Sequence, residues 1–157
     1  MIAFSLHSPS RYWKTVSFAS TLYLQPILDL LLAGVPEECE AVLRLGLQEA
    51  LVNAAKHGNQ LDPDKMILVH FASNHNRHWW VIRDQGKGFV PPTHCELPTV
   101  AHTLPHECCE CGRGLYILYQ VFDQVHWNGN GTNLRLCKDF NRSVKPIKPV
   151  IPELVLH

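Results

Sequence analysis

A carboxylate and a carboxamide lie one helical turn apart in the stretch 45–58, which reads L-G-L-Q-E-A-L-V-N-A-A-K-H-G. At about 100° per residue, Glu49 and Asn53 fall one above the other on a helix, among mostly apolar neighbours. A polar group left unpaired beside apolar surface costs about 1 to 3 kcal/mol, so the pair suggests a ligand, a metal ion or another polar partner. The alternative is a helix whose two polar residues reach solvent at the edge of its buried face.

Three glycine-containing segments further along the chain have the composition of ligand-binding loops. Asp84-Gln85-Gly86-Lys87-Gly88 follows an apolar run, and its glycines permit a positive φ or the close approach of a ligand to the backbone. Gly112-Arg113-Gly114 opens a further helical pattern, where free N–H groups and the helix dipole favour phosphate. Gly131-Thr132 leads the last apolar run. Each segment alone is weak evidence, because glycines are common at turns, but their order and spacing indicate a site.

The elements that must position these residues are helices alternating with hairpins. Apolar spacing predicts a first helix over 11–32, where Pro26 can kink it or start a new turn, and a second over 37–57 that Gly58 ends. The other expected elements are a short edge strand over 2–6, a hairpin of strands 65–73 and 78–83, a helix over 115–123, and strands over 124–128 and 132–138. The proline-rich segment 90–111 has no sustained period and has the length of a lid.

The bulk composition fits one domain, which we expect over residues 1–140, followed by a flexible or surface-lying tail over 141–157. Fourteen basic and fourteen acidic side chains cancel, so neither nucleic acid nor a membrane is expected as a direct partner. The N-terminus lacks the pattern of a signal peptide and no apolar run has membrane-spanning length, so we expect a cytoplasmic location. The six cysteines are expected to be reduced thiols.

Together these motifs resemble the GHKL ATPases with the Bergerat ATP-binding fold, and within them the bacterial anti-sigma factor serine/threonine kinases of the RsbW and SpoIIAB type. Q-E-A-L-V-N-A-A-K-H-G is similar to their N box, R-D-Q-G-K-G-F to the first glycine box, G-R-G-L-Y-I-L to the second, and G-T-N-L-R-L to the closing strand. The resemblance covers nearly everything from residue 4 to residue 138. It implies an α+β fold, a two-layer α/β sandwich in which helices cover one face of a mixed, mostly antiparallel sheet.

The resemblance also implies that the motif residues bind ATP and Mg²⁺. Glu49 would be the general base that activates the attacking hydroxyl, and Asn53 would place a side-chain oxygen on Mg²⁺. Asp84 would accept a hydrogen bond from the adenine amino group, and Thr132 would support the same edge through its hydroxyl. The remaining nucleotide-binding residues are expected to be His57, Gly86, Gly88, Gly112, Arg113 and Gly114.

Some of these assignments leave alternatives open. Arg113 either contacts the phosphates or faces solvent, and His57, like Lys56, either reaches the phosphates or is an ordinary cation at a helix end. Family members often carry a basic residue just before the second glycine box, whereas here the run is Cys108-Cys109-Glu110-Cys111. This departure bears on phosphoryl transfer more than on nucleotide binding.

The segment 94–111 also has side chains of the types that bind Zn²⁺, namely His94, Cys95, His102, His106, Cys108, Cys109 and Cys111. Their spacing matches no standard zinc finger, and adjacent cysteines do not readily bind one ion together. Incidental lid residues and redox-sensitive thiols are the alternatives to a metal site.

By resemblance, the chain is expected to be an ATP-dependent protein serine/threonine kinase that sequesters a sigma factor and phosphorylates a serine of a STAS-type anti-sigma antagonist. A homodimer is expected through the N-terminal strand and first helix, where Phe4, Tyr12, Trp13 and Phe18 either supply apolar contact or belong to the core. An alternative of a different class is a non-catalytic module of the same fold, in which ATP only orders the lid and sets the affinity for a partner. A sensor histidine kinase domain is disfavoured, because no phosphoacceptor helix pair fits before the second helix.

Overall fold

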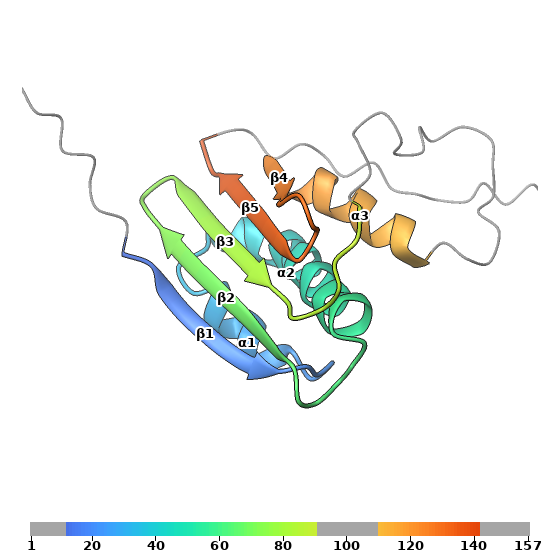
Figure 1. The fold of residues 1–157 in the computed structure, drawn as a ribbon. Coiled ribbons are helices and arrows are strands. Elements are labelled where there is room, and N and C mark those ends of the chain that lie inside the picture. The colour runs from blue at the N-terminus through green and yellow to red at the C-terminus, as the bar shows by residue number, and fades with distance from the viewer. Residues whose placement is uncertain (1–11, 91–109, 142–157) are drawn as a thin grey trace, which may run out of the picture.

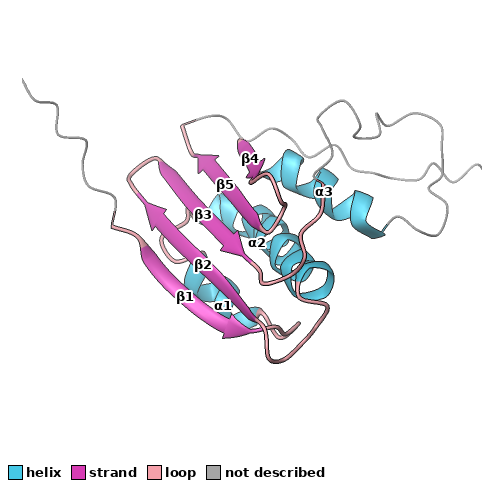
Figure 2. Ribbon diagram, in the orientation of Figure 1, coloured by secondary structure: helices cyan, strands magenta, loops and turns pink. Residues whose placement is uncertain are grey.

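Residues 12–90 and 110–141 are described by a computed structural model, with the backbone alone for 110–113. The described chain forms two layers, a five-stranded sheet and the helices that cover one of its faces (Figures 1 and 2). The strand order is β1-β2-β3-β5-β4, and every pair is antiparallel. The expected two-layer α+β sandwich is confirmed. In chain order the elements are β1 (Lys14–Ala19), α1 (Gln25–Leu31), α2 (Glu37–Val52), the π-helix η1 (Asn53–Gly58), β2 (Met66–Ser73), β3 (Arg77–Arg83), α3 (Glu110–Val121), β4 (Gln124–Trp127) and β5 (Asn133–Asp139).

Alternate residues of the strands face the helices and form the core. On the central strand β3, Trp80 is only 1% exposed, and it lies opposite Phe71 of β2 and Leu136 of β5. Its Nε1 donates a 3.1 Å hydrogen bond to the carbonyl oxygen of Leu31, so the one polar atom of this buried ring is satisfied at the end of α1. The indole therefore fixes the position of α1 against the sheet.

The helix expected over 11–32 is wrong in its first half. Residues 14–19 form the strand β1, and only α1 is helical in this region. Burial alternates along β1, with Val16 and Phe18 packed against the core and Ser17 exposed between them. β-Branched and aromatic residues suit such a half-buried strand, and pairing with β2 supplies contacts that the local spacing does not reveal. Pro26 lies in the first turn of α1, where its fixed φ is compatible with a helix, rather than at a kink.

The second helix is found where it was expected, but its last turn is not α-helical. α2 runs without a break into η1, in which each turn contains one extra residue. The wider hydrogen bonds continue past the element, because the N–H of Asn59 donates to the Ala54 carbonyl at 2.8 Å. Such π-turns are often found at functional sites, and this one contains the second half of the 45–58 motif.

The later elements agree with the sequence except at the start of α3. The expected hairpin is confirmed as β2 and β3, and β4 and β5 lie within a residue of the expected strands. α3 begins at Glu110, five residues before the expected start at residue 115. Gly112 and Arg113 therefore lie in the first turn of the helix, and Gly114 lies within the helix rather than before it.

The C-terminal end of α3 is held against both α2 and β5. A Cβ placed on Gly46 of α2 would lie 2.8 Å from side-chain atoms of Val121 and Phe122, so the two helices are in close contact there. Lys138 of β5 is buried, and its Nζ donates a 2.9 Å hydrogen bond to the Val121 carbonyl. This bond satisfies one of the last carbonyl groups of the helix. The same Nζ lies 3.6 Å from Oδ2 of Asp123.

Several expectations fall outside the described residues. These are the strand over 2–6, residues 91–109 of the lid expected over 90–111, the tail from residue 142, and the His and Cys side chains considered for Zn²⁺. The last two residues of that expected lid, Glu110 and Cys111, begin α3 instead. Within the ranges 12–90 and 110–141, no group of three or more His, Cys, Asp or Glu side chains is placed to hold a metal ion. None of the helices in those ranges combines the length and the apolar character needed to cross a bilayer.

Candidate functional site

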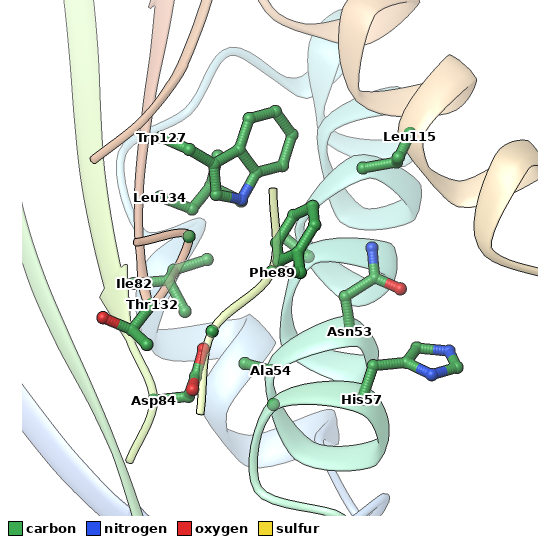
Figure 3. Close-up of a pocket in the computed structure, with 14 residues that line it drawn as sticks. Asn53, Ala54, His57, Ile82, Asp84, Phe89, Leu115, Trp127, Thr132 and Leu134 are labelled. Carbon is green, nitrogen blue, oxygen red and sulfur yellow. The ribbon is translucent and has the colours of Figure 1, made fainter. Parts of the chain in front are cut away.

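A cavity of about 230 Å³ lies between the sheet and the end of the second helix (Figure 3). Its walls come from α2 and η1, the end of β3 and the loop after it, α3, β4, and the start of β5. The larger lining side chains are apolar: Ile82, Phe89, Leu115, Trp127 and Leu134. The polar lining side chains are Asn53, His57, Asp84 and Thr132. A mainly apolar cavity with a few converging polar groups is typical of a small-molecule site.

Asp84 follows β3 directly and provides the carboxylate that faces this cavity. Its backbone N–H donates to the Thr132 carbonyl at 3.1 Å, and its Oδ1 accepts a 2.8 Å hydrogen bond from the N–H of Gly86. A Cβ on Gly58 would lie 2.5 to 2.8 Å from the carboxyl atoms, so the carboxylate occupies space that any larger residue would fill. Burial raises the pKa of Asp84, and hydrogen bonds from backbone N–H groups and the positive charge of Lys65 partly offset this rise. Oδ2 remains available to accept a hydrogen bond from a ligand.

The loop after Asp84 packs against the turn before β5. Gly88 has a φ of +78°, which L side chains rarely adopt, and the next N–H, that of Phe89, donates to the Asn130 carbonyl at 3.1 Å. The rings of Phe89 and Trp127 meet edge to face, with centroids 5.9 Å apart and planes at 80°, and form the wall opposite η1 (Figure 3). The Thr132 hydroxyl donates to Oδ1 of Asn130 at 3.0 Å. The hydroxyl oxygen can still accept a hydrogen bond, so the expected support of the adenine edge by Thr132 stays a prediction.

Glu49 and Asn53 lie together against the backbone of α3. A Cβ placed on Gly114 would lie 3.0 Å from Oε2 of Glu49, 3.4 Å from Nδ2 of Asn53 and 3.5 Å from its Oδ1. The structure thus brings the polar pair of the 45–58 motif next to the last residue of the Gly112-Arg113-Gly114 segment, which is far away in the sequence. The surroundings of Gly112 and the side chain of Arg113 lie outside the description, so their expected contacts with a ligand stay predictions.

His57 and Asn53 extend from the same side of the helix, and Asp84 lies on the other side of the cavity (Figure 3). His57 is exposed, whereas Asn53 is half-buried. The site therefore has two different ends. One end offers the half-buried carboxylate of Asp84 among apolar walls, and the other offers a carboxamide, an imidazole and the nearby carboxylate of Glu49.

A family model described as a histidine kinase-like ATPase domain matches residues 25–138. This match includes every residue that lines the cavity. The chain belongs to the histidine kinase-like ATPase domain family. The GHKL resemblance is thereby confirmed at the level of the superfamily, and the antiparallel sheet with its helical layer is the Bergerat fold of that family.

Individual solved structures are also similar to this chain. Twelve chains of solved structures match, and one of them is the mycobacterial sensor histidine kinase MprB. It is 19% identical, with a TM-score of 0.44, over 82% of this chain and 97% of that one. No curated protein matches the chain significantly.

As a histidine kinase-like ATPase domain, the chain is an ATP-binding domain, and the lining of its cavity is chemically compatible with an adenine base. Ile82, Leu134 and the Phe89–Trp127 pair provide apolar walls for a flat ring. Asp84 supplies a hydrogen-bond acceptor, and adenine presents an exocyclic amino donor. With a base at this end, the polar groups at the opposite end, beside α3, would be on the side of the phosphates.

Asn59 is a positioning residue of this ATPase site that the sequence analysis missed. Its side chain is fully buried, and Nδ2 donates to Oγ of Ser20 at 2.7 Å and to the Met66 carbonyl at 3.0 Å. Oδ1 accepts a 2.7 Å hydrogen bond from the N–H of Gln85, the residue next to Asp84. One amide therefore fixes the end of η1, the start of β2 and the backbone beside the base-facing carboxylate.

The two aromatic walls were also missed. Phe89 is the last letter of the first glycine box, and its presence in that motif was the only available signal. Trp127 belongs to no motif, but it lies opposite Leu134 in the β4–β5 pair, and both side chains line the cavity. Only the register of the last two strands reveals its orientation.

Proposed function

We propose that this ATP-binding domain is a protein serine/threonine kinase that acts as an anti-sigma factor and transfers the γ-phosphoryl group of ATP to a serine of a STAS-type antagonist. The observation that carries the proposal is the position of Glu49, beside Asn53 and the α3 backbone at Gly114. Gly58 contacts the Asp84 carboxylate, and nine helical positions separate it from Glu49, a rise of about 13 Å. This separation suits a nucleoside triphosphate lying along the helix, with its base at Asp84 and its last phosphate near Glu49.

Glu49 has the chemistry of a general base for this reaction. A carboxylate can take the proton of an attacking serine hydroxyl while the phosphoryl group is transferred. The oxygen of the Asn53 carboxamide is a ligand type that suits Mg²⁺, which would neutralise phosphate charge there. Asp84 selects the base through a hydrogen bond, and the Phe89–Trp127 wall excludes water from that end.

The proposal includes a sigma factor and the antagonist as protein partners, a homodimer, and no direct contact with nucleic acid or a membrane. Two aromatic residues just before the β1 segment support apolar contact between copies, because Tyr12 is 87% exposed and Trp13 is 45% exposed. Phe18 is packed against the core instead, and Phe4 lies outside the described residues.

The decisive experiment replaces Glu49 by Gln, which keeps the size of the side chain and removes its basicity. With a purified STAS-domain antagonist and labelled ATP, we expect the rate of phosphoryl transfer to fall by about 10² to 10⁴-fold. The Kd for Mg-ATP, measured by calorimetry, should change little, because Glu49 does not line the base-binding cavity. The matched control is Gln48→Ala, an exposed neighbour whose loss should change neither quantity. Transfer at the wild-type rate in Glu49→Gln would reject this residue as the base.

The competing function is a non-catalytic module in which ATP only controls partner binding. The acidic Glu110, which stands where family members often carry a basic residue, favours this alternative. The same variant separates the two functions in cells. Full control of the partner by Glu49→Gln would support the binding module, and loss of control would support the kinase.

A further inference from the structure

The face of the sheet opposite the helices carries a second surface feature. In the view of Figures 1 and 2, α1 and α2 lie behind the sheet and α3 lies beside the β4 edge, so the face turned toward the reader is not covered by a helix of the described chain. Antiparallel pairing sets residues in rows across this face. One row runs from His70 through Val81 and Arg135 to His126, and the neighbouring row contains Trp79.

A groove of about 390 Å³ follows these rows. Trp13, Trp79 and Val81 contribute apolar surface to it, and Arg135 and His126 contribute polar and cationic surface. Trp13 is 45% exposed, so one of the two indoles is accessible from solvent. Tryptophan and arginine are enriched among the residues that carry the energy of protein interfaces.

The charge on this face is one-sided. Arg83 and Arg135 are both exposed, and neither forms an ion pair with another residue of the described ranges. Among the outward-facing positions of β1 to β5, the acid is Asp139, and the Nε of Arg77 already contacts its Oδ2 at 2.7 Å. The groove therefore combines an apolar floor with one lining arginine, Arg135, and Arg83 lies two residues beyond Val81 on β3, although the whole chain has a formal charge of zero.

We propose that this groove docks an extended acidic segment of a partner protein. An apolar or aromatic side chain of the segment packs against Trp79 and Val81, and carboxylates on either side pair with Arg83 and Arg135. Residues two apart in an extended segment point the same way, so acidic and apolar side chains at alternate positions can contact the face together. The site is separate from the ATP cavity and does not depend on phosphoryl transfer.

Charge excludes the other occupants. In a two-fold symmetric contact, a second copy would set Arg83 and Arg135 against themselves. The C-terminal segment of the chain carries Arg142, Lys145 and Lys148 against a single Glu153, so it is cationic as well. Nucleic acid is disfavoured because its binding relies on many cations, and this face offers two unpaired arginines.

The test is selection from a random 12-residue peptide library displayed on phage, against the immobilised full chain at low salt. We expect the selected peptides to carry Asp or Glu two residues before and two residues after an aromatic or aliphatic residue. Synthetic copies should bind Arg83→Glu/Arg135→Glu about tenfold or more weakly than the wild type, because two attractions become repulsions. The matched control is Lys14→Glu. Lys14 is an exposed cation on β1, two residues before Val16 and therefore on the side of the strand that faces the helices, not on the side of the groove. It should bind the peptides like the wild type.

The outcomes that overturn the proposal are specific. Peptides without acidic residues, no selection above background, or equal binding to the charge-reversed variant would each contradict it. Binding of a 15-nucleotide poly(dT) that the double reversal abolishes would assign the face to nucleic acid, and a dimer that the same reversal dissociates would assign it to a second copy. Calorimetry with Mg-ATP should give the same Kd for all variants, which shows that they are folded and keeps this test independent of the proposed kinase activity.

Discussion

Replacing Asp84 by Asn separates the contribution of this side chain to nucleotide binding from its contribution to stability. The carboxylate is held by a 2.8 Å hydrogen bond from the Gly86 N–H to Oδ1, and Oδ2 is left for the ligand. In the variant the amide oxygen can keep the bond to Gly86. The amide NH₂ group then replaces Oδ2 and presents a donor to the donor of adenine.

The expected loss of affinity follows from the hydrogen bond that disappears. A hydrogen bond to a charged group contributes about 1.5 to 3 kcal/mol, which corresponds to about a 10- to 100-fold rise in Kd for Mg-ATP. Guanine has a carbonyl oxygen where adenine has its amino group, so the new amide donor suits GTP better than the carboxylate does. The ratio of the GTP and ATP dissociation constants should therefore fall in the variant. Calorimetric titration of both nucleotides into both proteins measures this directly.

The Asp84→Asn substitution should weaken ATP binding but increase the free energy of unfolding at neutral pH relative to acid pH. Burial raises the pKa of Asp84 above its ordinary value of 3.8, so the folded protein binds this proton more tightly than the unfolded chain does. The contribution of Asp84 to the free energy of unfolding therefore falls as the pH rises from 3.8 through the folded pKa, and the penalty is fully present above it. The carboxamide of the Asp84→Asn variant cannot ionise, so the stability of the variant relative to the wild type should increase between about pH 4 and pH 7.

Urea unfolding at about pH 4 and pH 7, combined with the ATP and GTP titrations, tests these expectations for Asp84→Asn. Unchanged ATP affinity would show that Asp84 does not contact the base. A variant that becomes less stable relative to the wild type as the pH rises would show that hydrogen bonds to the carboxylate outweigh its burial. An unchanged GTP-to-ATP ratio would contradict the assignment of the amino group to this side chain.

Three further predictions concern two close backbone contacts and one set of side-chain hydrogen bonds. Gly46→Ala forces a Cβ to within 2.8 Å of Phe122 and should lower the free energy of unfolding in urea by about 1 to 3 kcal/mol, although alanine favours the helix by about 1 kcal/mol; a more stable variant would show that α3 can shift. Asn59→Ala removes three hydrogen bonds, one buried and two part-buried, and should cost about 2 to 4 kcal/mol in the same assay, with weaker Mg-ATP binding; an unchanged unfolding midpoint would disprove its structural role. Gly114→Ala places a Cβ 3.0 Å from Oε2 of Glu49, so phosphoryl transfer should slow by about 10- to 100-fold with little change in unfolding; wild-type transfer would separate this contact from catalysis.

The parts of the site that depend on local chemistry were predictable from the sequence. A carboxylate and an amide four residues apart lie on the same side of any helix, and glycines after a strand permit a turn or a close backbone approach in any fold. The β2–β3 hairpin was likewise predictable, because two apolar runs flank a polar turn in which Oδ1 of Asn74 accepts the N–H groups of Asn76 and Arg77 at 3.0 and 2.8 Å.

The parts that depend on contacts between distant segments were not predictable. β1 has apolar residues at spacings that suit a helix as well as a strand, and only its pairing with β2, about 50 residues away, selects the strand. The start of α3 contains two glycines, each of which costs a helix about 1 kcal/mol, so local propensity placed the start too late. Asn59 gives no periodic signal, because its three hydrogen bonds reach three different segments.

α3 is attached to the rest of the domain at its C-terminal end, so a tilt of this helix would pivot about that end. Its C-terminus is held by the close contact with Gly46 and by the Lys138 hydrogen bond, whereas Gly114 lies seven residues toward the other end, about 10 Å along the axis. A rotation of about 5° around the fixed end would move Gly114 by about 1 Å, a displacement large enough to cost a rate on the order of 10²-fold when it misplaces a catalytic group. Small changes in the tilt of one helix would thus set the spacing between Glu49 and its surroundings, while the far end of the domain stayed in place.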